Sequence, residues 1–202
     1  MSAPHAYDVV SSERIYGGRV ISLRRDEVRM PGAVTSVREV VEHPGAVAVV
    51  ALDGDDRVVM VRQYRHPVRR YLEELPAGIL DVEGEPAYRA AARELAEEAG
   101  LAADEWHTLV DLLTTPGMSD EATRIFLARG LREVDREVQE HEEAEMTSSR
   151  VPLQELVRQV LAGELENALA VAGVLAADRA ARDGFEGLRP HDAPWPARPA
   201  AS

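Results

Sequence analysis

The chain has 202 residues, 45% of them hydrophobic, a length that suits one substantial core better than several domains. Its formal net charge of −13 argues against nucleic acid or an anionic membrane as a partner, and no stretch approaches the roughly 20 apolar residues of a membrane helix. The absence of cysteine excludes disulfides, thiolate nucleophiles and cysteine-held zinc, so a bound metal would need oxygen or imidazole ligands, as a hard cation such as Mg²⁺ does.

The N-terminal part of the chain consists of short β-rich runs separated by turn residues. Strand-forming residues fill 19–23 and 34–41, and breaks fall at 30–32 and 43–45. This alternation predicts an antiparallel meander, and residues 1–45 are treated as a separate β-rich segment. The N-terminus also lacks the basic start and apolar run of a secretion signal, so we expect a cytoplasmic protein.

Strands and helices alternate over the next part of the chain. The apolar runs 46–52 and 58–61 flank a turn and predict a central hairpin, and a breaker-free, Ala-rich helix is expected from Ala87 to Ala99, between Pro86 and Gly100. Two further strands are expected at 106–110 and 124–128, joined by a loop at 114–121.

The C-terminal part of the chain begins with helical patterning at 153–161 and 167–182. Residues 185–202 are rich in Pro and are expected to form an irregular tail. The order of strands, helix, strands and helices predicts an α/β fold, a layered α/β/α sandwich with a mixed central sheet over residues 46–184.

Three carboxylates share one stripe of the predicted helix. Glu94, Glu97 and Glu98 stand at i, i+3 and i+4, where like charges repel by a few tenths of a kcal/mol per pair and where hard metal ions could be shared. The opposite stripe is small or apolar and is expected to face the core: Tyr88, Ala91, Ala92, Leu95 and Ala99. Spacing alone leaves a second interpretation open, a solvated acidic face with Arg93 as an internal ion-pair partner.

The residues around this helix resemble the Nudix box, G-x5-E-x7-R-E-U-x-E-E-x-G-U with U aliphatic. Every specified position from Glu85 to Leu101 matches that pattern. One position departs from it, because the glycine falls at Gly78 while the expected place holds Ile79. The loop before the helix therefore carries one additional residue, and the spacing of the helix carboxylates is unchanged.

The Nudix resemblance implies a set of metal ligands. By analogy with the family, Glu94, Glu97 and Glu98 would bind Mg²⁺ together with the carbonyl oxygen of Ala77, and Mn²⁺ could substitute. Glu85 and Arg93 would contact these ligands rather than the metal, and the guanidinium of Arg93 would orient the carboxylates.

Segments outside the box resemble those of ADP-ribose pyrophosphatases and imply substrate contacts from Arg62, Arg65, Glu74 and Gly117. The two arginines belong to a dense basic cluster in an acidic protein, and Arg can fork onto phosphate oxygens or stack on a base. A solubility patch on an edge strand is the alternative interpretation, and it applies best to Arg69 and Arg70.

The acidic run 140–145 is expected to be a loop. In ADP-ribose pyrophosphatases a glutamate of such a loop activates or positions the attacking water, and Glu142 and Glu143 both match that place. Taken without the resemblance, the run is more typical of a solvated acidic loop.

The resemblance thus implies a Mg²⁺-dependent enzyme that hydrolyses ADP-ribose to AMP and ribose 5-phosphate. It also implies a homodimer in which the segment 1–45 contributes to dimerisation and substrate binding. Two alternatives stay open: a Nudix hydrolase of another nucleoside diphosphate sugar, a dinucleotide or a nucleoside triphosphate, and a non-catalytic module that binds ADP-ribose. The intact helix glutamates argue against the second alternative.

Overall fold

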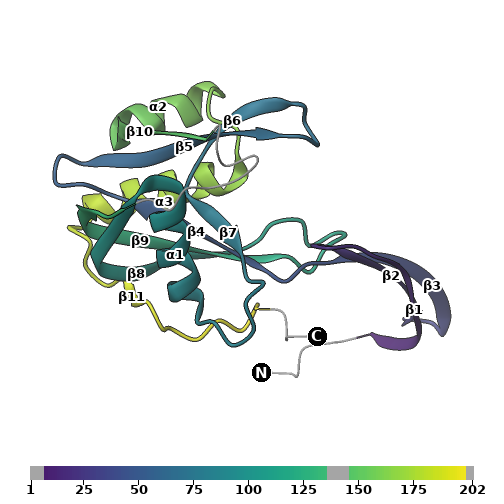
Figure 1. The fold of residues 1–202 in the computed structure, drawn as a ribbon. Helices are drawn as coiled ribbons and strands as arrows, with labels where there is room; N and C mark the ends of the chain where they lie inside the picture. Colours follow the sequence, from purple (N-terminus) through teal and green to yellow (C-terminus); the bar gives the residue numbers. More distant parts are fainter. Residues whose placement is uncertain (1–6, 136–145, 199–202) are drawn as a thin grey trace.

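The computed structural model describes residues 7–135 and 146–198. Their strands form three sheets, and helices cover both faces of the largest sheet (Figure 1). Within these two ranges, no helix is long and apolar enough to cross a membrane.

The central sheet is mixed. Its strand order is β11 (Arg189–Pro190), β8 (Leu101–Leu113), β9 (Ala122–Glu133), β4 (Ala46–Ala51) and β7 (Ala77–Ile79). β4 runs parallel to β9, while the other neighbours are antiparallel. All six residues of β4 are buried, as expected of a strand covered on both faces, and this explains its uninterrupted apolar sequence.

Helices pack on the two faces of this sheet. Helix α1 (Ala87–Ala99) covers one face over a core cluster that includes Val49, Leu95 and Phe126. Helices α2 (Leu153–Ala162) and α3 (Ala168–Arg182) contribute to the cluster on the opposite face. The expected α/β/α sandwich with a mixed central sheet is therefore confirmed.

A second sheet consists of β10 (Thr147–Pro152), β5 (Arg57–Arg65) and β6 (Arg70–Glu74). The predicted central hairpin is wrong, because β4 and β5 belong to different sheets and meet only in an isolated bridge between Leu52 and Val58. Buried apolar runs on either side of a turn do not by themselves determine which strands pair.

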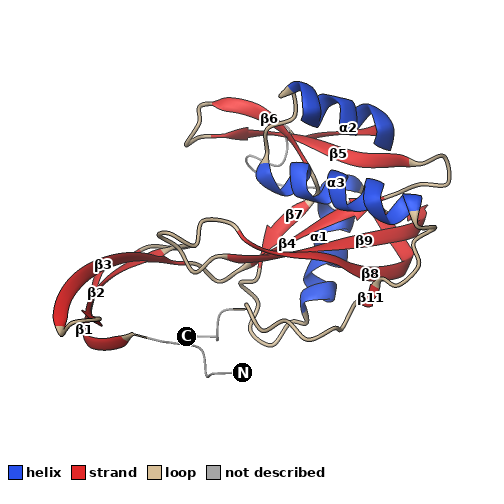
Figure 2. Cartoon of the chain, turned by 180° about the vertical axis from the view of Figure 1, so that it is seen from behind, coloured by secondary structure: helices blue, strands red, loops and turns tan. Residues whose placement is uncertain are grey.

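The third sheet is an antiparallel arm of β1 (Asp8–Gly17), β2 (Ser22–Met30) and β3 (Val34–Glu42). It projects from the body of the molecule, as Figures 1 and 2 show. The meander is confirmed, but residues 19–21 lie in the turn before β2 rather than in a strand. β2 is rich in charged residues, so an apolar strand pattern does not indicate it.

The C-terminal segment has little regular structure, as expected, yet it packs against the body. Its only strand in the described range is β11, where Arg189 and Pro190 pair with Thr108 and His107 of β8. From there the chain continues along the lower edge of the molecule in Figure 1.

Candidate active site

Helix α1 has the predicted bounds because its two ends are set by backbone geometry. Pro86 precedes it in an extended conformation, and Gly100 ends it with a left-handed φ of 66°. The predicted core stripe is correct in outline, since Ala91 and Leu95 are buried, although Ala90 takes the place expected for Ala92.

Arg93 links three of the predicted carboxylates. Its Nη1 donates to Glu94 at 2.7 Å and to Glu97 at 3.1 Å, and its Nη2 lies 3.3 Å from Glu85. Burial alone would lower the pKa of Arg93, but the hydrogen bond that Arg93 donates to Glu85 and the charges of Glu94 and Glu97 outweigh it and raise that pKa. The like-charge repulsion along the helix is therefore offset by one shared cation.

Glu98 connects α1 to the central sheet. Only 6% of the residue is exposed, and its Oε2 accepts a hydrogen bond of 2.9 Å from the backbone N–H of Ala77 in β7. The predicted carbonyl ligand, Ala77, thus lies in direct contact with a predicted carboxylate ligand. Glu98 is not part of a solvated helix face, and this weighs against the acidic-surface interpretation of the stripe.

Gly78 explains the shifted glycine of the box. A Cβ atom at this position would overlap the carboxyl group of Glu94, so a side chain is excluded as long as Glu94 stays where it is. The glycine that the helix requires is therefore Gly78, and the additional residue of the loop is absorbed between Ile79 and Glu85.

The donor set fits a hard divalent cation by its chemistry, because carboxylate oxygens and a backbone carbonyl are the ligands that Mg²⁺ prefers. No three acidic or histidine side chains among residues 7–135 and 146–198 are gathered in a ligating arrangement. The reason is visible in the contacts: Glu94 and Glu97 are turned to Arg93, and Glu98 to Ala77. A cation would draw the first two away from the guanidinium.

The structure places the two predicted substrate arginines differently. Arg65 donates from Nε and Nη2 to the buried carboxylate of Glu74, at 2.9 and 2.6 Å. Arg65 and Val59 are six residues apart on β5 and therefore point to the same face of the strand, and Val59 packs in the cluster under α1. Since alternate strand residues share a face, Arg65 points to the side of the helix glutamates.

Arg62 belongs to the other face of β5. It is two residues from Met60, so the two side chains point to the same face of β5, and Met60 packs in the cluster of α2 and α3. The guanidinium of Arg62 lies 4.8 Å from the ring of Tyr71. Three residues of separation along a strand always place two side chains on opposite faces. The structure therefore brings Arg65 and Glu74, but not Arg62, to the side of α1.

Of the remaining predicted residues, the structure describes Gly117. Gly117 is exposed in the loop between β8 and β9, which also joins the arm to the body: the Val41 N–H donates to Met118 O at 2.8 Å, and the His43 N–H to Asp120 at 2.9 Å. Glu142 and Glu143 lie outside the described residues.

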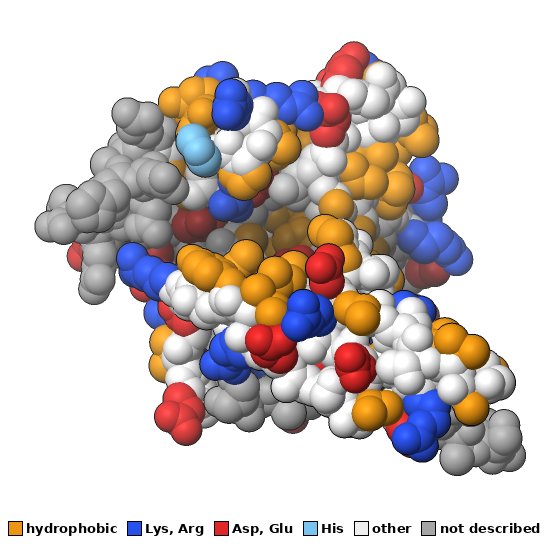
Figure 3. All heavy atoms as spheres, turned by 90° about the vertical axis from the view of Figure 1, so that its right-hand side faces the viewer, with side chains coloured by type: hydrophobic (Ala, Val, Ile, Leu, Met, Phe, Trp, Pro, Cys, Tyr) orange, Lys and Arg blue, Asp and Glu red, His pale blue; other side chains and the backbone are white. Residues whose placement is uncertain are grey.

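Figure 3 views the side from which the arm and the β5–β6 hairpin project, and shows a hollow beneath a rim that carries Arg side chains.

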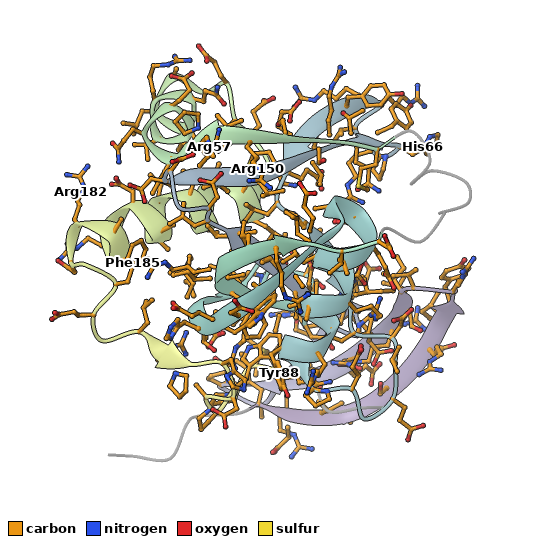
Figure 4. The ribbon with its side chains drawn as sticks, turned by 60° about the vertical axis from the view of Figure 1, so that its left-hand side comes forward. Arg57, His66, Tyr88, Arg150, Arg182 and Phe185 are labelled. Carbon is orange, nitrogen blue, oxygen red and sulfur yellow. The ribbon has the colours of Figure 1, made fainter. Side chains whose placement is uncertain are left out.

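An open cavity of about 440 Å³ lies elsewhere, at the carboxyl ends of β4 and β9. Arg57 and Arg150, which lie together in Figure 4, line it with Asp53. These groups pair with one another, since Asp53 accepts from Arg57 at 3.0 Å and lies 3.3 Å from Arg150. The helix glutamates, rather than this cavity, carry the arrangement suited to chemistry on an anionic substrate.

Comparison with known proteins gives the following similarities. Residues 42–171 match the family model described as "NUDIX domain". The chain is 54% identical over 199 residues to an ADP-ribose pyrophosphatase of Mycobacterium tuberculosis, covering 98% of this chain and 96% of that protein. It is 38% identical over 161 residues to an ADP-ribose pyrophosphatase of Bacillus subtilis, covering 79% and 85%. A solved structure titled "Crystal structure of ADP compounds hydrolase" has the same fold, with a TM-score of 0.78 at 22% identity, over 91% of this chain and 98% of that one.

Proposed function

This chain belongs to the Nudix hydrolase family, and we accordingly propose that it hydrolyses the pyrophosphate of ADP-ribose to AMP and ribose 5-phosphate. The observation that carries the proposal is the junction of α1 with β7, where Glu94 closes on Gly78 and Glu98 holds the backbone of Ala77. The near full-length similarity to proteins named ADP-ribose pyrophosphatase supports the substrate.

Glu94, Glu97 and Glu98, with the Ala77 carbonyl, would hold Mg²⁺ or Mn²⁺. The bound cation supplies charge neutralisation at the pyrophosphate and lowers the pKa of the attacking water. Arg93 keeps Glu94 and Glu97 close together before metal binding, and through Glu85 it ties both to the loop in front of the helix. Glu85 and Arg93 therefore position ligands rather than touch substrate.

Arg65 and Glu74 are proposed to act on the substrate side of this helix. Arg65 has 42% of its side chain exposed, which leaves part of the guanidinium accessible to a phosphate while Glu74 fixes its other edge. Glu142 or Glu143 is proposed to position the attacking water, and Gly117 to line the site from the loop between β8 and β9. A cytoplasmic location belongs to the same proposal.

A substrate panel tests this function. ADP-ribose, other nucleoside diphosphate sugars, dinucleotides and nucleoside triphosphates are incubated with Mg²⁺ or Mn²⁺, and the products are separated chromatographically. ADP-ribose should give the highest kcat/KM, with AMP and ribose 5-phosphate as products. A higher kcat/KM for another compound would reassign the substrate, and binding of ADP-ribose without turnover of any compound would indicate a non-catalytic module.

Arg65→Ala should raise the KM for ADP-ribose by about tenfold, because it removes one charge-assisted contact with the pyrophosphate. Arg62→Ala is the matched control on the opposite face of β5 and should leave KM within about twofold. Since Glu74 is buried beside Arg65, Arg65→Gln is measured as well, to keep a hydrogen-bond donor next to that carboxylate. An unchanged KM in Arg65→Ala would return Arg65 to a surface role, and an equal rise in KM in Arg62→Ala would contradict the separation of the two residues by strand face.

We propose that the arm mediates a homodimer. It exposes a set of large apolar side chains: Val9, Val10, Ile15, Tyr16, Val20, Ile21, Val34 and Val37. So many exposed apolar residues on one projecting sheet are uncommon in a monomer. Light scattering at micromolar concentration should give twice the chain mass of 22.1 kDa, and Ile15→Asp should shift the protein toward that single-chain mass. A wild-type protein that is monomeric under these conditions would count against the dimer.

A further inference from the structure

The segment from Leu188 to Arg198 forms a strap along the face of the central sheet that carries α1. Figure 4 shows it leaving Phe185 at the end of α3 and running down toward Tyr88 in α1. β11 fixes its beginning on β8, and the hydroxyl of Thr108 donates to the carbonyl of Pro190 at 2.9 Å. The strap lies beyond residue 171, where the match to the family model ends.

A buried guanidinium holds the middle of the strap. Arg124, in β9, is 2% exposed, and it donates to the carbonyls of Ala193 and Pro194 at 2.6 and 3.0 Å. Asp111 of β8 accepts from the same guanidinium at 2.7 and 3.0 Å. Burial would raise the pKa of Asp111, but hydrogen bonds from Arg124 and Arg189 outweigh it and keep the pKa low. A buried charge that is fully paired in this way ties the backbone of the strap to the sheet.

Two aromatic side chains connect the strap to α1 and to the core cluster beneath that helix. The ring of Trp195 lies 4.9 Å from the guanidinium carbon of Arg124 and packs on the core cluster that includes Leu80 and Leu95. His191 and Tyr88 have ring centroids 4.4 Å apart. The strap thus touches the first turn of α1 and packs on the cluster to which the preceding loop contributes Leu80.

The first turn of α1 lacks the usual stabilising groups. Pro86 provides no side-chain cap, and the turn contains no acidic residue. Contacts from outside the helix therefore add to the hydrogen bonds that the N–H groups of Arg89 and Ala90 donate to the carbonyl of Pro86. Glu94, Glu97 and Glu98 lie on the same rigid element, so a helix that tilts at Tyr88 also moves these carboxylates relative to Ala77 and Gly78.

We propose that the strap is a positioning element for the metal site, with Trp195 and His191 holding α1 in the register that its carboxylates need to bind a divalent cation. The inference rests on the proposed metal-dependent function. It assigns no contact with substrate to the strap. A strap with a merely structural role would affect the melting temperature alone, whereas a positioning strap also determines metal affinity in the folded protein.

The test measures Mn²⁺ binding to the full-length protein by electron paramagnetic resonance, well below the melting temperature and without substrate. Trp195→Ala should weaken Mn²⁺ binding about tenfold, in the range typical of residues behind metal ligands, and His191→Ala should add to the loss. Trp195→Phe keeps a ring over Arg124 and should restore the affinity to within about twofold. Both kcat and the Mg²⁺ requirement should follow the affinity, while the KM for ADP-ribose at saturating Mg²⁺ changes little.

Leu156→Ala is the matched control. Leu156 is 1% exposed in the cluster on the opposite face of the sheet, so its truncation destabilises the protein away from α1 and from the cluster on which Trp195 packs. Mn²⁺ affinity should stay at the wild-type level in this variant even where its melting temperature falls as far as that of Trp195→Ala. Equal loss of affinity in the two variants, or unchanged affinity in Trp195→Ala, would overturn the proposal. A wild-type protein that binds Mn²⁺ but hydrolyses nothing would instead count against the proposed function alone.

Discussion

Glu98→Gln is expected to lower hydrolysis of ADP-ribose by at least about 100-fold, even at saturating Mg²⁺, while the fold is retained. The substitution removes one charge from the proposed ligand set and conserves shape. A glutamine carbonyl can still accept the hydrogen bond that Ala77 donates to Glu98 at 2.9 Å. Because an uncharged amide is cheaper to bury than a carboxylate, the melting temperature of the metal-free protein should not fall. Steady-state kinetics across a Mg²⁺ titration and thermal unfolding provide the two measurements.

Glu142 and Glu143 provide the contrast for Glu98→Gln. Replacing a helix glutamate should raise the Mg²⁺ concentration needed for activity. One of Glu142→Gln and Glu143→Gln should instead lower kcat, with little change in the Mg²⁺ requirement or in KM. Near wild-type turnover of Glu98→Gln would remove Glu98 from the ligand set. Full kcat in both Glu142→Gln and Glu143→Gln would place the base elsewhere.

Gly78→Ala is expected to cost about 10- to 100-fold in activity, although it adds a single methyl group. The new Cβ would overlap the carboxyl group of Glu94, which is the far end of a side chain and can swing away. In doing so Glu94 would leave both Arg93 and its position beside β7. The substitution should therefore act on the metal site rather than on stability, and Mn²⁺ binding should weaken while the melting temperature changes little.

A double-mutant cycle isolates this mechanism. If Gly78→Ala acts by displacing Glu94, then adding Glu94→Gln should cost little more than the worse single variant. Gly54→Ala serves as the control, since a Cβ there meets no atom within 4 Å and its φ is not in the left-handed region. Additive losses in the cycle, or wild-type metal affinity in Gly78→Ala, would contradict the proposed role of this glycine.

The helix of the Nudix box could be predicted to the residue because local rules determine both of its ends. Pro86 and Gly100 bound an Ala-rich run without breakers, and the bounds of α1 follow from these residues alone. The common stripe of the three carboxylates was predictable for the same reason, since they are three and four residues apart on one element. The sequence also located the glycine of the box, although its role became clear only from the approach of Glu94.

Features that depend on distant partners could not be predicted in this way. The pairing of β4 with β9 rather than with β5 brings together residues 77 positions apart, such as Ala46 and Thr123. Arg62 and Arg65 are close in sequence and were predicted together, whereas their side chains point to opposite faces of β5 because they are an odd number of positions apart. Composition indicated an irregular tail at 185–202, but not that a buried arginine in β9 would bind its backbone.

The strap also has a consequence for the order of events during synthesis and folding. His191 follows Tyr88 by 103 positions, so the contact between them closes one of the longest loops in the molecule. Contacts of high sequence separation form slowly, and this one cannot form before the residues around His191 have been synthesised. A nascent chain that has already exposed all of α1 still lacks the contacts of the strap. Hydrolytic competence should therefore arrive late, after the sheet has formed, and a ribosome stalled before residue 191 should hold a folded core that binds metal poorly.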